Sequence, residues 1–332
     1  MKYVYVLSYD GKGTYLEQML VSITSLKMQM HSSEIIIILD NNSKKYINKG
    51  NRILKSFQVE IKYVDIDCME YNIVERSRIL KTLMYNLINE DFLYIDSDTI
   101  ICEDLSTIQN QNIDYIGMVK DYHYNYSEHP ARDYFDINAK KCGYHPCYGN
   151  LHFNGGMMYV KKSQLSLGFF ELWHNLYLQG LKNGVPADQA SLNEANYRLK
   201  GVIKEMNGIW NCQLSNTACS AQYVYHAKIL HYMASKSSVK MPYDLANEDI
   251  LRSILSEDKE NKSKLDNILH DPKSAFCSTK GYLCDIDDVV IIQSIFFGRL
   301  KNIYIHKKKV YNSFNRIARL LNYIDNHIIK KS

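Results

Sequence analysis

The stretch FLYIDSDTII, residues 92–101, combines a short apolar run with two aspartates. The apolar run, FLYI, is typical of a buried strand. Asp96 and Asp98 follow it directly, so their carboxylates can face one hard cation while Ser97 points elsewhere or contacts the ligand. A surface turn is the usual alternative for an isolated Asp-x-Asp. The first hypothesis is therefore a strand that ends at a cation site.

Strands and helices alternate on both sides of this stretch. Apolar residues at helical spacing, such as Leu16, Met19 and Ile23, predict helices between the strands. Short apolar runs predict strands at residues 3–8, 35–39, 59–64, 92–95 and 115–119. This alternation predicts an α/β fold with a mostly parallel sheet flanked by helices.

Polar residues accumulate where these predicted strands end. They are Ser8, Asp10, Asp40, Asn41, Asp96, Asp98, Lys120 and Asp121. Ligands of such sheets bind beyond the carboxyl ends of the strands. Some of these acids could merely end a strand or cap a helix, but their accumulation favours a ligand site at this edge.

The alternation weakens past Gly201, and from about Asp244 the sequence looks helical and polar. We therefore expect an α/β domain over residues 1–243 and a helical, basic C-terminal region over residues 244–332. SEDKENKSK, residues 256–264, predicts a solvated linker or loop. The tail after Phe297 is basic and amphipathic, with the cations Arg299, Lys301, Lys307, Lys308, Lys309, Arg316, Arg319, Lys330 and Lys331.

Composition limits the class of protein. A chain of 332 residues with 46% hydrophobic content can bury a full core. The formal net charge of +4 is modest, so we expect no nucleic-acid partner. The cysteines lack Cys-x-x-Cys spacing, and the N-terminal apolar stretch is too short for a signal peptide, which together predict a cytoplasmic protein.

Four blocks in order resemble the family 8 glycosyltransferases. They are FLYIDSDTII (92–101), FNGGMMYVKK (153–162), PADQASLN (186–193) and KILHYMASK (228–236), and the similarity spans about residues 1–240. The resemblance implies a GT-A, Rossmann-like fold for the domain at 1–243. It also implies a retaining enzyme that moves a hexose from a UDP-sugar to a glycan, glycolipid or protein-linked acceptor.

The resemblance also implies a metal site. In similar enzymes the two acids of the Asp-x-Asp and a later histidine bind manganese, which maps onto Asp96, Asp98 and His231; Mg²⁺ is the alternative ion. The family block continues with a glycine and, six residues after the histidine, a lysine that contacts the diphosphate. This sequence instead has Ala234, and its lysine, Lys236, comes five residues on. His226 is the alternative ligand if the strand register differs.

Further residues are implied to bind the donor. Asn154 and Gly155 match residues that contact the donor sugar or diphosphate, although a plain turn is the alternative. Asp188 and Gln189 match a pair that faces the sugar, with the acid at its hydroxyls and the amide near the anomeric carbon. Asp188 could otherwise be only a helix N-terminal acid.

The nucleotide and diphosphate contacts are implied to come from the first half of the chain. Arg78 best matches a cation that reaches the donor, with Arg76 and Lys81 as alternatives. The remaining candidates are Ser8, Asp10 and Tyr15 around the uridine, Ser97 at the diphosphate and Asp121 at the sugar.

Two rival functions remain open. A nucleotidyltransferase would carry a glycine-rich, basic loop after its first strand, and GKGT, residues 11–14, is a poor version of one. A non-catalytic sugar-nucleotide or membrane-surface binding protein is the other rival, but the complete set of site residues disfavours it.

The acceptor is expected to meet the loop at residues 122–152. The tail from Arg299 to Lys331 is expected to reach an anionic membrane and a lipid-linked acceptor, unless it simply packs on the domain.

Overall fold

A computed structural model of the protein describes residues 1–214, 221–232, 245, 247–256, 258–276, 291 and 294–327. The chain divides into two compact units. Unit 1 comprises Met1–Ser215 and Ser220–Gly281, and unit 2 comprises Asn216–Cys219 and Tyr282–Ser332.

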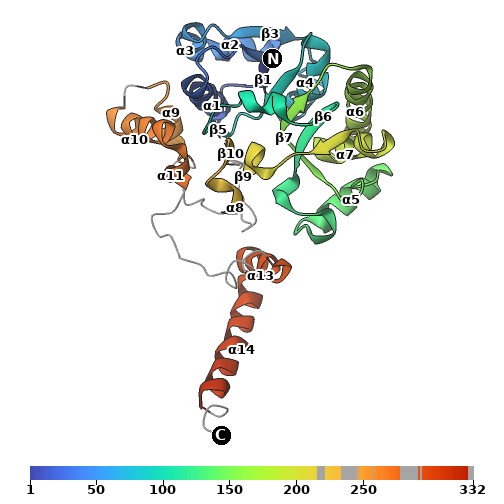
Figure 1. Ribbon diagram of the computed structural model, residues 1–332, viewed down its shortest axis with the longest axis vertical. Coiled ribbons are helices and arrows are strands. Elements are labelled where there is room, and N and C mark those ends of the chain that lie inside the picture. The colour runs from blue at the N-terminus through green and yellow to red at the C-terminus, as the bar shows by residue number, and fades with distance from the viewer. Residues whose placement is uncertain are drawn as a thin grey trace. The chain divides into compact units, whose positions relative to one another are not determined.

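Unit 1 is built on a seven-stranded sheet with the order β3-β2-β1-β4-β7-β6-β8 (Figure 1). The strand β7 runs antiparallel to β4 and β6, and the other pairings are parallel. The strands are β1 (Lys2–Leu7), β2 (Ile35–Asp40), β3 (Glu60–Val64), β4 (Phe92–Ile95), β6 (Ile116–Lys120), β7 (Phe153–Val160) and β8 (Ile203–Glu205). The mostly parallel α/β sheet predicted from the sequence is confirmed.

Helices cover both faces of the sheet. They are α1 (Tyr15–Gln29), α2 (Lys44–Ile47), α3 (Asn51–Ser56), α4 (Ile73–Leu87), α5 (Arg132–Cys142), α6 (Gln164–Lys182), α7 (Asp188–Arg198), α8 (Ala221–Val224), α9 (Glu248–Arg252), α10 (Lys259–His270) and α11 (Pro272–Phe276). Short 3-10 helices lie at Asn41–Ser43, Asn48–Gly50, Ser106–Asn110, Asp121–His123, Tyr126–Glu128 and Gly208–Asn211.

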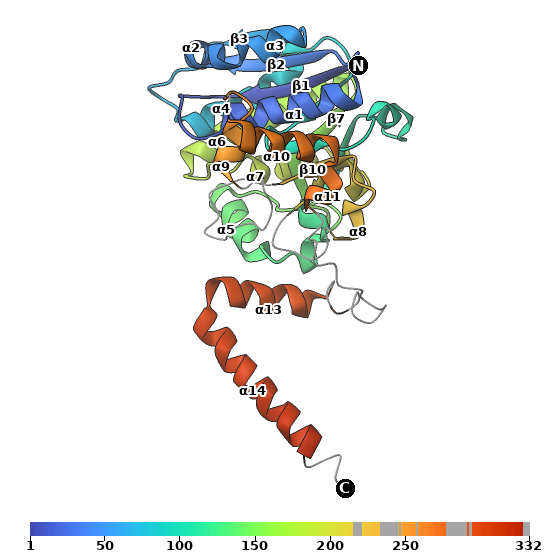
Figure 2. The ribbon, with the colours of Figure 1, turned by 90° about the vertical axis from the view of Figure 1, so that its left-hand side faces the viewer.

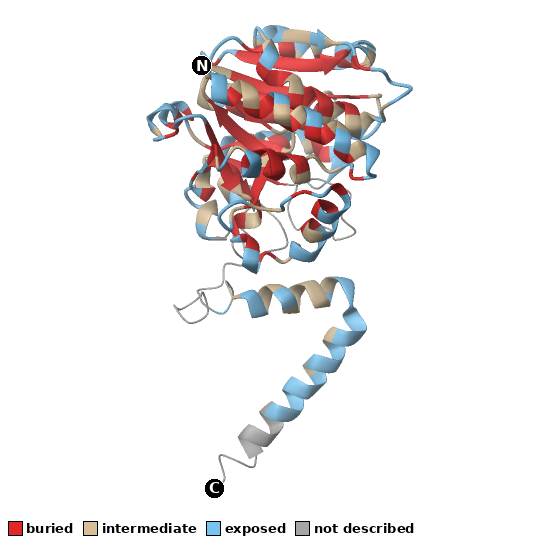
Figure 3. Ribbon diagram, turned by 90° about the vertical axis from the view of Figure 1, so that its right-hand side faces the viewer, coloured by how far each residue is buried: buried red, intermediate tan, exposed pale blue. Residues whose placement is uncertain are grey.

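Each central strand contributes to two cores because successive side chains point to opposite faces. In β1, Tyr3, Tyr5 and Leu7 join the core beneath α1, whereas Val4 and Val6 join the core beneath α4 and α6. The strands are therefore buried along most of their length (Figure 3). This explains why they read in the sequence as continuous apolar runs.

The helices α9 and α10 belong to unit 1. Leu251, Leu265 and Ile268 are buried in the same core as α1, and Figure 2 shows α10 beside α1. The prediction of a linker or loop over residues 256–264 is wrong from Lys259 on, where α10 begins, but the described residues of this stretch are solvated and the buried face of α10 starts at Leu265. The domain division at residue 243 stays a prediction, and α9 to α11 lie in the unit that contains the sheet.

The predicted loop over residues 122–152 contains the helix α5. Three of its four histidines, His123, His129 and His152, are buried, and the ring of His152 stacks on Phe135 with 3.9 Å between centroids. Aromatic packing, which a short sequence pattern does not reveal, orders this part of the segment.

Unit 2 contains α13 (Ile295–His306) and α14 (Lys308–His327). Among the helices that the structure describes, no helix has the length and apolar character needed to cross a bilayer.

A second, three-stranded sheet in unit 1 has the order β5-β10-β9, with β5 at Thr99–Ile101, β9 at Cys212–Gln213 and β10 at Ile229–His231. The strands β10 and β5 are antiparallel, and His231 lies opposite Thr99 in their register. This pairing brings a histidine from late in the chain beside the end of β4.

Candidate active site

A cavity of about 340 Å³ opens at the carboxyl ends of β1 and β4. These two central strands are neighbours in the sheet. On the far side of β1 lie β2 and β3, and on the far side of β4 lies β7, so the strand order reverses direction between β1 and β4. Such a switch point is where open α/β sheets bind ligands. The polar residues lining the cavity are Ser8, Tyr15, Gln18, Ser77, Arg78, Lys81, Asp96, Ser97, Asp98, Asn154, Asp188, Gln189 and His231.

Asp96, Asp98 and His231 form a cluster at the floor of this cavity. Each offers one ligand atom, and these atoms lie within 4.8 Å of one another. Asp96 follows β4, and its amide donates to Gly156 O at 2.8 Å. The amide of Tyr232 donates to Asp98 O at 3.0 Å, which ties β10 to the Asp-x-Asp turn.

Asp98 and His231 are electrostatically paired, with 3.1 Å between Oδ1 and Nε2. Burial favours the neutral form of Asp98, but the charge and hydrogen bond of His231 outweigh burial and lower the pKa of this carboxyl. Burial acts in the opposite sense on His231, and the pair with Asp98 outweighs it to raise the pKa of the imidazole. The cluster is thus a concentrated negative site balanced by one histidine.

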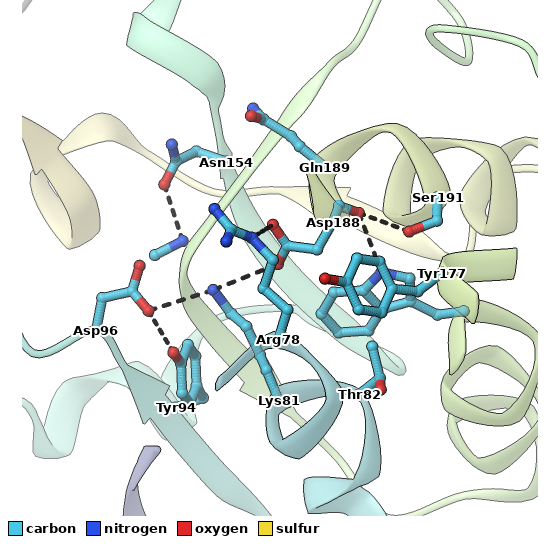
Figure 4. A network of polar contacts seen from close by, with 12 residues as sticks. Arg78, Lys81, Thr82, Tyr94, Asp96, Asn154, Tyr177, Asp188, Gln189 and Ser191 are labelled. Atoms are coloured by element: carbon cyan, nitrogen blue, oxygen red, sulfur yellow. Dashed lines mark hydrogen bonds and ion pairs between the residues drawn. The ribbon is translucent and has the colours of Figure 1, made fainter. Parts of the chain in front are cut away.

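Lys81 and Arg78 form a second layer of charge beside the cluster (Figure 4). Lys81 Nζ lies 3.2 Å from Asp96 Oδ1 and 3.8 Å from Asp188 Oδ2, and Arg78 Nε donates to Asp188 Oδ1 at 3.1 Å. The hydroxyl of Tyr94 also donates to Asp96. Lys81 therefore lies between the two carboxylates.

The helix α4 positions both cations. Asn72 caps it by accepting from the amides of Val74 and Glu75, and Glu75 accepts from the amide of Asn72 in return. Arg78 and Lys81 are three residues apart, so they share one face of the helix. That face lines the cavity.

Asp188 is the first residue of α7, as the sequence suggested, and it also lines the cavity. Burial disfavours its charge, but Lys81 and Arg78 outweigh burial and lower the pKa of this carboxyl. Gln189 donates from Nε2 to Phe153 O at 3.1 Å. Both residues of the pair line the cavity.

The structure brings most of the predicted site residues together but not all of them. Asp10 accepts from the amide of Lys12 and does not line the cavity. Asp121 lies behind Asn154, which donates to it at 2.7 Å. Lys236 lies outside the described residues.

The structure also distinguishes the alternative candidates for the donor-binding cation and for the histidine ligand. Arg76 is buried in an ion pair with Asp40 at 3.0 Å and does not line the cavity, whereas Arg78 and Lys81 do. His226 is exposed and lies outside the acid cluster, which takes His231 instead.

Gly156 and Asn211 are two residues of the site that the sequence analysis missed. A Cβ on Gly156 would lie 2.6 Å from His231 Nδ1, so no other residue fits without moving the ring. The Gly-Gly pair in FNGGMMYV was the available signal. Asn211 contacts His231 but stands in a block for which the sequence offered no pattern.

The buried histidines behind the site predict a pH dependence of stability. Burial lowers the pKa of His152 to about 4, although the nearby charge of Asp121 opposes this. Between pH about 6.5 and about 4 the unfolded chain therefore takes up a proton at this position and the folded protein does not. Protonation favours unfolding, so the free energy of unfolding should fall by about 3 kcal/mol over this window on account of His152.

His152→Phe keeps the aromatic volume and removes the titration. Urea unfolding at several pH values should therefore show a shallower loss of stability for this variant than for the wild type between pH about 6.5 and about 4. Parallel curves for the two proteins would contradict the buried, neutral state of His152.

The arrangement can hold a divalent cation and an anion together. Carboxylates and an imidazole suit a cation of the Mn²⁺ or Mg²⁺ kind. Two further cationic side chains face the same cavity and suit a phosphate group.

Comparisons with known proteins agree with this geometry. The sequence model of the family "Glycosyl transferase family 8" matches residues 6–237. No curated protein sequence gives a significant match.

Solved structures share the fold at low sequence identity. The galactosyltransferase LgtC, solved with donor and acceptor sugar analogs, is 15% identical with a TM-score of 0.51, covering 80% of this chain and 100% of LgtC. An active-site mutant of LgtC is 16% identical with a TM-score of 0.52, covering 80% of this chain and 95% of the mutant. The glycosyltransferase GlyE of Streptococcus pneumoniae TIGR4 is 14% identical with a TM-score of 0.50, covering 85% of this chain and 66% of GlyE.

The family match spans the large sheet, the Asp-x-Asp turn, the glycine pair of β7 and the histidine of β10. The fold is that of the GT-A glycosyltransferases. The chain therefore belongs to glycosyl transferase family 8.

Proposed function

We propose that the protein transfers a hexose from a UDP-sugar to an acceptor hydroxyl, with a bound divalent cation and with retention of the anomeric configuration. The observation that supports this best is the cluster of Asp96, Asp98 and His231, which lines one cavity with Lys81 and Arg78 at the switch point of the sheet. A nucleoside diphosphate needs both a cation and basic side chains around it.

The donor set of the cluster fits the proposed ion. Two carboxylates and one imidazole, with their ligand atoms within 4.8 Å of one another, suit Mn²⁺ and leave room for oxygen ligands from a substrate, with Mg²⁺ as the alternative. When bound, such an ion neutralises the charge that develops on the leaving diphosphate. Asp96, Asp98 and His231 would hold it.

The remaining residues of the cavity would bind and orient the donor. Lys81 and Arg78 would lie along the diphosphate, and Lys236 is proposed to join them. Asp188, held ionised by the two cations, would accept from sugar hydroxyls. Gln189 would present its amide near the anomeric carbon, and Asn154 and Gly155 would contact the sugar or the diphosphate.

The other predicted donor contacts are also proposals. Ser8 and Tyr15 line the cavity where β1 ends, and Ser97 lies between the two acids of the cluster, which supports contacts with the uridine and the diphosphate. Asp10 and Asp121 are proposed at the uridine and at the sugar, although neither lines the cavity.

Retention is proposed because, among the residues that the structure describes, no carboxylate lining the cavity is free to act as a dedicated base. Asp96 and Asp98 belong to the cluster, and Asp188 is paired with Arg78 and Lys81. The departing phosphate would itself take the acceptor's proton in a front-side displacement. An NMR spectrum of early product should show the anomeric configuration of the donor, and an inverted configuration would refute this mechanism.

A screen of UDP-sugars for Mn²⁺-dependent release of UDP tests the proposed reaction without an acceptor. One UDP-hexose should be hydrolysed well above the others, and chelation should stop the release. A protein that binds UDP-sugars but releases no UDP with any acceptor preparation would be the binding protein considered as a rival. Release of pyrophosphate from a nucleoside triphosphate would instead indicate a nucleotidyltransferase.

We also propose that the acceptor is lipid-linked and that α14 meets an anionic membrane on the cytoplasmic side. Val310, Phe314, Ile317 and Leu321 recur at helical spacing along α14 and are exposed. The cations of this helix fall on its other side, at Lys308, Lys309, Arg316 and Arg319. A helix of this kind can lie in a membrane interface.

Sedimentation with liposomes tests the membrane contact. Binding should rise with the fraction of anionic lipid, fall with salt and disappear when the chain ends before Arg299. Vesicles of neutral phosphatidylcholine serve as the matched control. Protein that stays in the supernatant at low salt would refute the contact and favour a soluble or protein-borne acceptor.

A further inference from the structure

A chain of buried polar contacts runs from His231 away from the cavity. His231 Nδ1 lies 3.1 Å from Asn211 Oδ1, and Asn211 Nδ2 donates to Asn154 Oδ1 at 3.1 Å. Asn154 Nδ2 donates to Asp121 Oδ1 at 2.7 Å. All four residues are buried, and Asn211 and Asp121 do not line the cavity.

The direction of this chain is fixed by a backbone group that cannot be reversed. The amide N–H of Gly156 donates to Asn154 Oδ1 at 2.8 Å. If the side chain of Asn154 were turned over, its NH₂ group would face this N–H, and its oxygen would face the carboxylate of Asp121. Asn154 therefore presents its oxygen to Gly156 and its NH₂ group to Asp121.

The orientation of Asn154 sets that of Asn211. The oxygen of Asn154 can only accept, so Asn211 must turn its NH₂ group toward it. The oxygen of Asn211 then faces His231 Nδ1, which must carry a proton to make a hydrogen bond. Nε2 faces another acceptor, Asp98 Oδ1 at 3.1 Å, so in the metal-free protein both ring nitrogens donate; a metal ion that takes the place of the Nε2 proton would leave the proton on Nδ1.

The last residue of this chain of contacts, Asp121, also has a partner on its other oxygen. Asp121 is a suitable terminal acceptor because His129 lies on its other oxygen, with 3.1 Å between Nε2 and Oδ2. The amide of Ala131 donates to His129 Nδ1 at 3.0 Å, so the proton of a neutral His129 is on Nε2, facing Asp121. Burial disfavours the charge of Asp121, but His129 outweighs it and the pKa of this carboxyl is lowered.

We propose that Asn211 is a positioning residue that holds His231 as the Nδ1–H tautomer through the chain Asp121, Asn154 and Asn211, and so presents Nε2 to the metal ion. This inference rests on the proposed function, because that function supplies the metal ion that Nε2 would bind. The N–H of a metal-binding histidine commonly donates to a carboxylate or carbonyl that fixes its tautomer and ring orientation. Here a side-chain amide would do so, with the carboxylate two residues further along the chain of contacts.

The test is a measurement of which ring nitrogens of His231 carry a proton, with Mg²⁺, which is diamagnetic, and without a metal ion. Long-range ¹⁵N–¹H correlation spectra of protein labelled at its histidines distinguish protonated from unprotonated ring nitrogens. The signals of His231 are those that disappear in His231→Gln. We expect Nδ1 to carry a proton in both states and Mg²⁺ to remove the proton of Nε2 alone. An unprotonated Nδ1 in either state would overturn the proposal without any further variant.

Asn211→Leu tests whether the amide matters to the metal. It keeps the volume and removes the acceptor, so we expect Nδ1 of His231 to lose its hydrogen bond and Mn²⁺ to bind roughly 10–100-fold more weakly by electron paramagnetic resonance. Asn196→Leu is the matched control, because Asn196 is also a buried amide but accepts from the amide of Ile203, outside this chain.

The outcomes separate this inference from the proposed function. Equal Mn²⁺ affinity in Asn211→Leu and Asn196→Leu would overturn the role of Asn211. A wild type whose Nδ1 carries a proton but that binds no Mn²⁺ would refute the metal-dependent function and leave the role of the chain of contacts standing. Mn²⁺ binding by a protein with an unprotonated Nδ1 would do the reverse.

Discussion

Asp98→Asn is expected to lower Mn²⁺-dependent turnover of the UDP-sugar by about 1,000-fold while leaving the fold intact. The substitution keeps the size of the side chain and removes one negative ligand atom from a cluster of three. A cation held by Asp96 and His231 alone would be bound weakly and would neutralise the diphosphate poorly. The loss should appear in kcat/KM for the donor and should persist at high Mn²⁺.

Two controls make this result specific. Asp266→Asn, on the exposed face of α10, removes an equal charge far from the cluster in sequence and should leave turnover unchanged. Thermal unfolding of Asp98→Asn in EDTA should resemble that of the wild type. Turnover within about tenfold of the wild type would remove Asp98 from the proposed ligand set.

Gly156→Ala should produce the second large effect. The added methyl group would lie 2.6 Å from His231 Nδ1 and 2.8 Å from Asn154 Oδ1, both of which are buried and hydrogen-bonded. The ring of His231 must shift to admit it, and the hydrogen bonds on Asn154 must lengthen. We expect a loss of about 1–3 kcal/mol in unfolding free energy and a roughly 10–100-fold loss of Mn²⁺ affinity.

Gly168→Ala provides the comparison for this variant. Gly168 lies within α6, and a methyl group there would meet no atom within 4 Å, so this variant should be as stable as the wild type or slightly more so. Calorimetry and Mn²⁺ titration should be run on both. Wild-type Mn²⁺ affinity in Gly156→Ala would mean that the position of His231 is not set by the close approach of β7.

The central strands could be predicted because they are buried on both faces. In β1, β2 and β4 every residue but Lys2 is buried, so each strand appears as an apolar run. The strands β5 and β10 have three residues each, too few for a periodic pattern. The small sheet that delivers His231 was therefore invisible to periodicity, and only the family resemblance selected that histidine.

The first half of α10 was predicted as a linker or loop for a different reason. Most of its residues are polar, and Leu265, Ile268 and Leu269 alone pack into the core. A narrow apolar face of this kind becomes decisive only when a partner such as α1 is present. Tertiary packing, which local sequence does not contain, determined this element.

The site residues likewise include some that the sequence could predict and some that it could not. Asp96 and Asp98 follow a recognisable strand, and the family resemblance favoured Arg78 among the three cations near the start of α4. Burial of Arg76 against Asp40 excluded Arg76 from the cavity, and that pairing joins residues 36 positions apart. Asn211 was unpredictable because its two side-chain partners, Asn154 and His231, lie on separate strands.

Calorimetric titration of UDP into the wild type, with Mn²⁺ and with EDTA, tests the central claim most directly. The claim is that Asp96, Asp98 and His231 hold a cation on which nucleotide binding depends. Binding should be clear with Mn²⁺, at least tenfold weaker in EDTA, and equally weak in Asp98→Asn under both conditions. Equal UDP affinity with Mn²⁺ and with EDTA in the wild type would contradict the account.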